Sequence, residues 1–204
     1  MPDVSRTPAF KEWAVIVDAL LEGEQIVDVR KGGIREEGRH FALHATRCWL
    51  YPTVEHQKAE LLKPAYRHRV EATRDVLPEG DSGEIRIAGW ADVVGVAKLT
   101  EPEELDALDS KLIWSSDYAA SRLSWKKRDP LWVLVLRAHR LLEPLTVPFR
   151  AEYRGCSSWV DVDGLPPDPA TEPSEPALSD TAFEARLKGV VAALPAGLSD
   201  PVRS

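Results

Sequence analysis

The sequence predicts an α+β fold in which a small, curved or barrel-like mixed β-sheet is flanked by helices. Segments with helical spacing alternate with apolar runs typical of strands, and the longest run contains Gly89 and Gly95, which indicate a bent strand. The length of 204 residues and the hydrophobic content of 44% suffice for one core with an appendage. We therefore expect one globular domain over residues 8–162 and an acidic, proline-rich tail over residues 163–204.

The first predicted element is an amphipathic helix over residues 10–21. Apolar side chains recur there at helical spacing, with Lys11 and Glu12 on other faces. Gly23 follows where a residue in the left-handed conformation often ends a helix. The pattern therefore favours a helix over a strand.

Strands are predicted next, over residues 25–30 and 41–50, the first ending at a glycine pair and the second leading into a turn at Pro52. Residues 55–76 are rich in charged residues and leucine, and Pro64 interrupts them. This segment predicts a short helix, a break, and then either an irregular stretch or a strand.

The second half of the chain contains the strongest strand signals. Its predicted elements are a loop over residues 78–84, a long bent strand over 85–99, a short helix over 102–108, a helix from Ser115 or Ser116 to Trp125, the most apolar strand over 131–142, and a last strand over 153–162. The helix over 102–108 has acids in its first turn, as the helix dipole prefers.

The tail carries most of the net charge. The whole chain has a net charge of −7, and from Val160 onward eight acids face three bases, so residues 1–159 hold only about −2. Residues 165–176 are proline-rich and have no means of building a core. Residues 181–194 predict an amphipathic helix that is either detached or docked on the body. A nearly neutral body can still carry a basic face, although not the overall basic footprint of dedicated DNA-binding domains.

Localisation is expected to be cytoplasmic. No apolar run approaches the roughly 20 residues needed to span a bilayer, and the first residues lack the pattern of a signal peptide. Cys48 and Cys156 fit a reducing compartment. We expect no membrane partner.

The first candidate site is the glycine-rich sequence RKGGIREEG at residues 30–38. Glycine N–H groups beside guanidinium and ammonium groups can bind an anion, although the spacing is not that of a P-loop. The alternative is a tight hairpin turn with solvated charges. The predicted ligand-binding residues are Arg30, Lys31, Gly32, Gly33 and Arg35.

The second candidate site is LYPTVEHQ at residues 50–57. Glu55 and His56 are a candidate general acid/base pair, while Tyr51, Thr53 and Gln57 are candidate ligand-binding residues. Alternatively, Thr53 is the N-cap of a helix with an acid in its first turn, which requires no function.

The third candidate is RLSWKKRDP at residues 122–130, which interleaves an aromatic ring with cations. Trp125 among Arg122 and Lys126, with Trp114 upstream, is the composition used to bind single-stranded nucleic acid. The alternative is a helix end with a buried tryptophan. No metal or cofactor is expected, because His40 and His44 lie in a strand-like pattern that places them roughly 13 Å apart.

Two resemblances follow from these motifs. The strings KEWAVIVDAL, RKGGIREEG, LYPTVEHQ, RLSWKKRDPL and YRGCSSW resemble an uncharacterised bacterial family, labelled a domain of unknown function, over about residues 10–162. The order of a helix, a strand ending in VRKGG, GWADVVGVAKLTEP and LWVLVLRAHRLLEPL is similar to the ASCH and EVE branches of the PUA-like barrels. That resemblance implies binding of RNA, a modified base or a nucleotide in a cleft. Glu24 and Gln25 stand where many ASCH members place a lysine, so it implies no catalytic residue here.

The leading functional hypothesis is therefore a module that binds a nucleotide, a modified base or single-stranded RNA. One alternative is a hydrolase of a nucleic-acid derived substrate that uses Glu55 and His56. Another is a protein-interaction module of a bacterial regulatory or defence complex, whose acidic tail contacts a protein partner. The sequence does not decide whether the protein is an enzyme, nor does it fix an oligomeric state.

Overall fold

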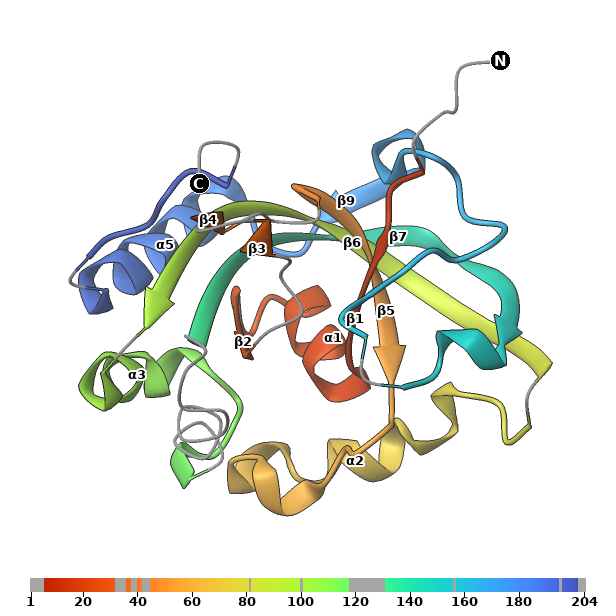
Figure 1. The fold of residues 1–204 in the computed structure, drawn as a ribbon, viewed down its shortest axis with the longest axis horizontal. Helices are drawn as coiled ribbons and strands as arrows, with labels where there is room; N and C mark the ends of the chain where they lie inside the picture. The colour runs from red at the N-terminus through yellow and green to blue at the C-terminus, as the bar shows by residue number, and fades with distance from the viewer. Residues whose placement is uncertain are drawn as a thin grey trace.

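A curled β-sheet that wraps around one helix forms the centre of the protein (Figure 1). The computed structural model describes residues 6–31, 36–37, 40–41, 45–80, 82–99, 101–117, 131–155, 157–194 and 196–201, and the structural statements below concern these residues. The strands are β1 (Ala9–Trp13), β2 (Val27–Lys31), β3 (Glu36–Glu37), β4 (His40–Phe41), β5 (Arg47–Thr53), β6 (Ser82–Leu99), β7 (Leu131–Arg150), β8 (Trp159–Val160) and β9 (Ser174–Pro176). The helices are α1 (Ala14–Leu21), α2 (Arg69–Ala72), α3 (Pro102–Leu108) and α5 (Asp180–Ala193).

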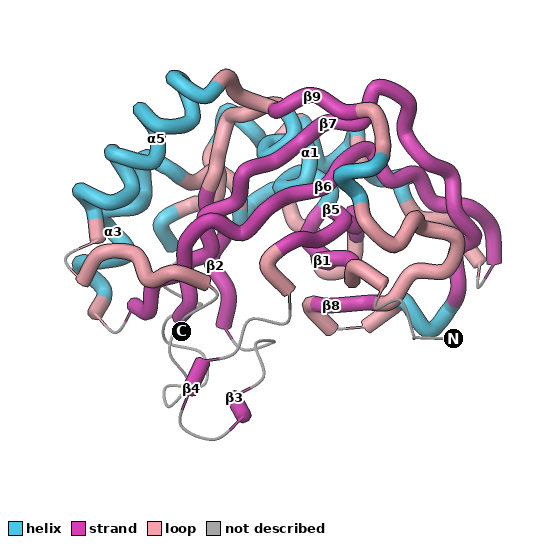
Figure 2. The backbone as a smooth tube through the Cα atoms, turned by 90° about the horizontal axis from the view of Figure 1, so that it is seen from above, coloured by secondary structure: helices cyan, strands magenta, loops and turns pink. Residues whose placement is uncertain are grey.

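The main sheet is mixed. Its strand order is β2-β7-β6-β5-β1-β8, and β9 pairs with β7 beside this path. β1 and β5 run parallel, whereas the other pairs of the sheet are antiparallel. Figure 2 shows the strands following one another around the curve. The predicted α+β fold with a curved mixed sheet and flanking helices is confirmed.

The curvature arises where glycines interrupt the long β6–β7 ladder. Register shifts occur between Ile87 and Gly89 and between Val93 and Gly95. The sequence predicts a bend near one or the other of these glycines, and the ladder is interrupted at both. At Gly89, an added Cβ would lie 2.3 Å from the carbonyl oxygen of His139, so only glycine fits. The close approach of two backbones therefore requires this residue.

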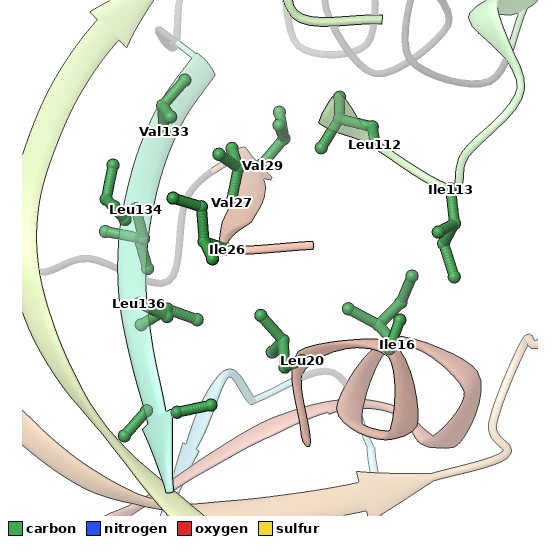
Figure 3. Close-up of a cluster of buried hydrophobic side chains, with 14 of the residues drawn as sticks. Ile16, Leu20, Ile26, Val27, Val29, Leu112, Ile113, Val133, Leu134 and Leu136 are labelled. Atoms are coloured by element: carbon green, nitrogen blue, oxygen red, sulfur yellow. The ribbon is translucent and has the colours of Figure 1, made fainter. Parts of the chain in front are cut away.

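The main core lies on the concave face of the sheet, around α1. Figure 3 shows Ile16 and Leu20 of α1 among apolar side chains of β2 and β7, with Ile113 alongside. A second apolar cluster, around Trp49 and Tyr51, lies on the opposite face. Burial on both faces explains why the central strands read as nearly continuous apolar runs.

The helix predicted over residues 10–21 is only partly correct. Its first part forms β1, which pairs with β5 and β8, and the helix begins at Ala14. The run AFKEW does not alternate as a half-buried strand does, and pairing with two neighbouring strands overrides its helical spacing. The prediction therefore fails for Lys11 and Glu12, which are strand residues, each less than 5% exposed.

β5 also differs from its prediction, because it continues through Pro52 to Thr53 instead of ending in a turn. β6 pairs only with Arg47 to Trp49 of β5, so at Pro52 the strand has β1 as its ladder partner. A proline, which lacks an N–H donor, is tolerated where one side of the strand is unpaired.

The remaining predictions have mixed outcomes. The strand over 25–30 corresponds to β2, the helix over 102–108 to α3 and the strand over 131–142 to β7, which runs on to Arg150. Residues 55–76 form α2 and 3-10 turns at Ala59–Leu61, Pro64–Tyr66 and Arg74–Val76, with no strand among the described residues. The strand over 153–162 shrinks to β8, and most of the helix to Trp125 lies outside the described residues.

The tail packs on the body, so of the two outcomes that the sequence left open for residues 181–194, a detached or a docked helix, the docked one is present. The predicted helix over 181–194 is present as α5, and its Phe183 and Val190 are buried, together with Leu194, in the main core. The proline-rich stretch contributes β9, which pairs with β7. No helix within the described ranges is long and apolar enough to cross a bilayer.

Candidate functional site

Arg30 bridges the two edges of the curled sheet. β2 stands at one end of the strand order, and β1 and β8 stand at the other. The Arg30 guanidinium nevertheless contacts both: Nη2 lies 2.7 Å from Glu12 Oε2, and Nη1 donates to Ser158 Oγ at 3.2 Å. It also donates to the carbonyl oxygen of Lys11. We call the group of Glu12, Asp28, Arg30 and Ser158 the seam, because side chains rather than a backbone ladder connect the edges there.

The seam holds two buried carboxylates. The side chains of Glu12 and Asp28 are 3% and 0% exposed, and Asp28 Oδ2 lies 2.9 Å from Arg30 Nε. Asp28 Oδ1 is buried and has no hydrogen-bond partner among the described residues. The Phe10 ring lies 4.3 Å from the Arg30 guanidinium carbon, a cation–π contact. The seam therefore combines a desolvated cation with a carboxylate oxygen that can accept a further hydrogen bond.

Lys11 and Glu55 fix the loop that leads into β8. Lys11 Nζ donates to the carbonyl oxygens of Tyr153 and Gly155 at 2.8 and 2.5 Å. Glu55 Oε2 accepts from the N–H of Gly155 at 2.9 Å, and Arg154 Nη1 lies 4.0 Å from Glu55 Oε1. The candidate acid/base residue Glu55 thus positions this loop in the structure.

Aromatic rings surround the seam. Trp13 follows Glu12 in the chain, and its ring centroid lies 4.8 Å from that of Trp114. Phe10 and Trp159 form a second pair at 5.1 Å. Trp13 and Trp114 are both buried, so the predicted ligand-binding residue Trp114 packs on a protein ring.

Two residues of the LYPTVEHQ motif lie on the α1 side of β1. Thr53 is the register partner of Trp13, and its Oγ1 accepts from the N–H of Glu55 at 3.2 Å. Gln57 Oε1 accepts from the N–H of Val15 in the first turn of α1, at 3.2 Å. Thr53 and Gln57 thus lie near Trp13 and the first turn of α1.

Tyr51 and His56 point elsewhere. Tyr51 belongs to the second apolar cluster, where its ring centroid lies 6.1 Å from that of Tyr153. Burial, and then the neighbouring Tyr153 and Glu55, raise the pKa of the Tyr51 hydroxyl above its usual value of 10.0. His56 is exposed and has a φ of 61°, in the left-handed region. The structure therefore does not bring all residues of this motif to one place.

The two cationic motifs join the described chain at one corner of the sheet. Lys31 ends β2 and Leu131 begins β7, and these two residues are register partners. Six predicted ligand-binding residues lie outside the described residues: Gly32, Gly33, Arg35, Arg122, Trp125 and Lys126. For Lys31 only the backbone is described.

Sequence reasoning missed the acidic residues of the seam and Lys11. A signal was present, because Asp28 stands inside an apolar strand, where an ionised side chain needs a buried partner. Glu12 gave no such signal, since a position on the polar side of a helix explained it.

The fold is therefore an α+β fold whose curled mixed sheet is bridged at its edges by the seam. The corner at Lys31 and Leu131 is the candidate binding region. A family model described as a domain of unknown function (DUF1802) matches residues 9–189, and the chain belongs to this family. The family resemblance inferred from the motifs is confirmed.

Solved structures similar to this chain include two from Zymomonas mobilis. The ASCH protein is 14% identical, with a TM-score of 0.40, over 91% of this chain and 96% of its own. A point mutant of the same ASCH protein is also 14% identical with a TM-score of 0.40, over 92% and 98% of the two chains. No curated protein matches this chain.

Proposed function

We propose that this protein binds a nucleotide, a modified base or single-stranded RNA at the corner where β2 ends and β7 begins. The observation that carries the proposal is the register pairing of Lys31 with Leu131. This pairing attaches both cationic motifs to the sheet side by side, next to Arg30. The two motifs therefore adjoin the described chain at the same corner, which supports a shared site.

The chemistry of this corner matches the parts of a nucleotide. Arginine and lysine side chains and glycine N–H groups bind phosphate oxygens. Trp125 supplies a ring for a base to stack on, and such stacking is worth about 1–3 kcal/mol per base.

The charge balance favours a small or single-stranded ligand over duplex DNA. The net charge of −7 gives no long-range attraction to a duplex. A local group of cations can still hold one to three phosphates. The hydrolase alternative receives no support from the position of Glu55, which is bound to Gly155.

The test is fluorescence anisotropy with a labelled ten-nucleotide oligo(U), measured against salt concentration and with nucleotides as competitors. The variant R122A/K126A removes two cations of the third motif. Its matched control, R86A/K188A, removes two exposed cations from β6 and α5. For single strands each lost phosphate contact lowers the salt slope by about 0.7, so we expect R122A/K126A to bind more weakly with a slope smaller by roughly 1.4.

Equal affinity losses in R122A/K126A and R86A/K188A would contradict the proposal, because only the overall charge would then matter. Adding EDTA distinguishes a binding module from a metal-dependent hydrolase. Binding that survives EDTA and weakens with salt supports a binding module, whereas metal-dependent loss of the oligonucleotide supports a hydrolase.

A further inference from the structure

The acids of the tail are bound by arginines of the body. Five ion pairs connect the acidic segment, residues 163–180, to arginines elsewhere in the chain. They are Arg6–Asp163 at 3.0 Å, Arg150–Asp163 at 2.6 Å, Arg47–Asp168 at 3.3 Å, Arg140–Glu175 at 3.0 Å, and Arg137–Asp180. Because the acids follow one another along one segment, these arginines line its path. We call Arg6, Arg47, Arg137, Arg140 and Arg150 the arginine path.

The ion pairs are not needed to hold the tail in place. Their side chains are between 26% and 81% exposed, and exposed ion pairs contribute only about 0–1 kcal/mol each. Apolar contacts hold the segment instead, through Leu165 at its start and Phe183 just beyond its end. Stability of the fold therefore does not explain why each of these acids lies next to an arginine.

Aromatic rings accompany the cations along the path. The Arg47 guanidinium carbon lies 4.9 Å from the centroid of Trp90, and the Trp90 ring stacks on His139 at 3.9 Å with an angle of 2°. The acidic segment covers this stack, since Ser174 Oγ accepts from Trp90 Nε1 at 3.2 Å. A row of guanidinium groups beside stacked rings is the composition of a surface for single-stranded nucleic acid.

We propose that the arginine path is a binding surface for the phosphate backbone of single-stranded nucleic acid, which the acids of residues 163–180 occupy within the same chain. The guanidinium fork binds phosphate oxygens in the way it binds a carboxylate. A nucleic acid also offers bases for the ring stack, whereas an acidic peptide offers only carboxylates. This surface is distinct from the corner at Lys31 and Leu131, and it does not depend on ligand binding there.

Neutralising two acids tests the proposal in the full chain. D168N/E175Q frees Arg140 from its ion pair and frees Arg47 from Asp168, while Asn retains an oxygen that can cap as Asp168 does for Ala170. The matched control D161N/E184Q makes the same chemical change at two exposed acids that form no ion pair with any described residue. Both variants change the net charge equally.

The probe is fluorescein-labelled oligo(U) of fifteen nucleotides, titrated at several salt concentrations. Arg140 loses its ion pair, whereas Arg47 still pairs with Asp92 at 2.7 Å, so the change adds one to two phosphate contacts and the salt slope of D168N/E175Q should steepen by roughly 0.7–1.4 relative to the control. Adding R140Q should remove at least half of this gain, whereas adding R86Q should leave it. The gain should persist when R122A/K126A is introduced, which separates this surface from the proposed corner.

Three results would overturn the proposal. The first is an equal salt slope in D168N/E175Q and D161N/E184Q. The second is a gain that R140Q and R86Q reduce equally. The third is an equal gain with poly-L-glutamate as the probe, which would assign the arginine path to acidic peptides. Circular dichroism of each variant confirms that it is folded before the titration.

Discussion

Replacing Arg30 by methionine is expected to destabilise the protein strongly. Among the described residues, Arg30 is the cation that pairs with Asp28, whose side chain is 0% exposed, and it also pairs with Glu12, which is 3% exposed. Methionine keeps much of the volume but removes the charge and all donors. A buried carboxylate would then lack its counter-ion.

The magnitude follows from the burial of this pair. Removing one partner of a buried ion pair costs about 3–5 kcal/mol, because the remaining charge stays desolvated. For a chain of this size, each kcal/mol lowers the melting temperature by about 2–4 °C. R30M should therefore lower it by roughly 6–20 °C.

Urea unfolding followed by circular dichroism measures this effect. The control is R74M, which breaks the exposed Arg74–Glu71 pair and should change the free energy of unfolding by less than about 0.5 kcal/mol. The double variant D28N/R30M removes the orphaned charge as well and should recover part of the loss. If R30M is no less stable than R74M, the seam does not hold the sheet edges together.

Two further predictions concern the tail and His139. Ending the chain at residue 162 should lower the melting temperature by roughly 9–36 °C, since it removes Phe183, Val190 and Leu194, each worth about 1.5–3 kcal/mol when buried. An unchanged melting temperature would instead support a domain boundary at residue 162. Burial lowers the pKa of His139 below 6.5, with Arg137 and Arg47 also lowering it and Asp92 opposing. The folded protein therefore binds this proton less readily than the unfolded chain, and the free energy of unfolding should fall as the pH drops below about 6.5. In H139Q this part of the pH dependence should disappear, and a profile identical to that of the wild type would contradict the assignment.

The sequence predicted those features of the fold that local residues determine. The bend at Gly89 could be predicted because a glycine inside a strand signals a close backbone approach, and His139 is the residue that approaches. The site was predicted in part: Arg30 was identified as a charged residue beside glycines, but its partner Glu12 was assigned to a helix. Pairing between β1 and β5 determines that partner, and a single sequence carries no record of such a pairing.

The tail shows the same limit in a different form. Proline-rich, acidic sequence usually buries too little apolar surface to be held in place. Here tryptophans of the body bind the tail, since Trp49 Nε1 donates to the carbonyl oxygen of Pro166 and Trp90 Nε1 donates to Ser174 Oγ. A prediction made segment by segment does not include the surface on which a segment docks.

The place of β1 in the sheet has a consequence for the order of folding. Ala9 pairs with Trp49, 40 positions along the chain, and with Val160, about 150 positions along it. Contacts over such separations form late, because closing long loops loses entropy before the contacts are made. During synthesis, β1 therefore gains its neighbour β8 only after about 150 further residues have been added. Until then its backbone donors and acceptors on that side are open to water, to other chains and to chaperones.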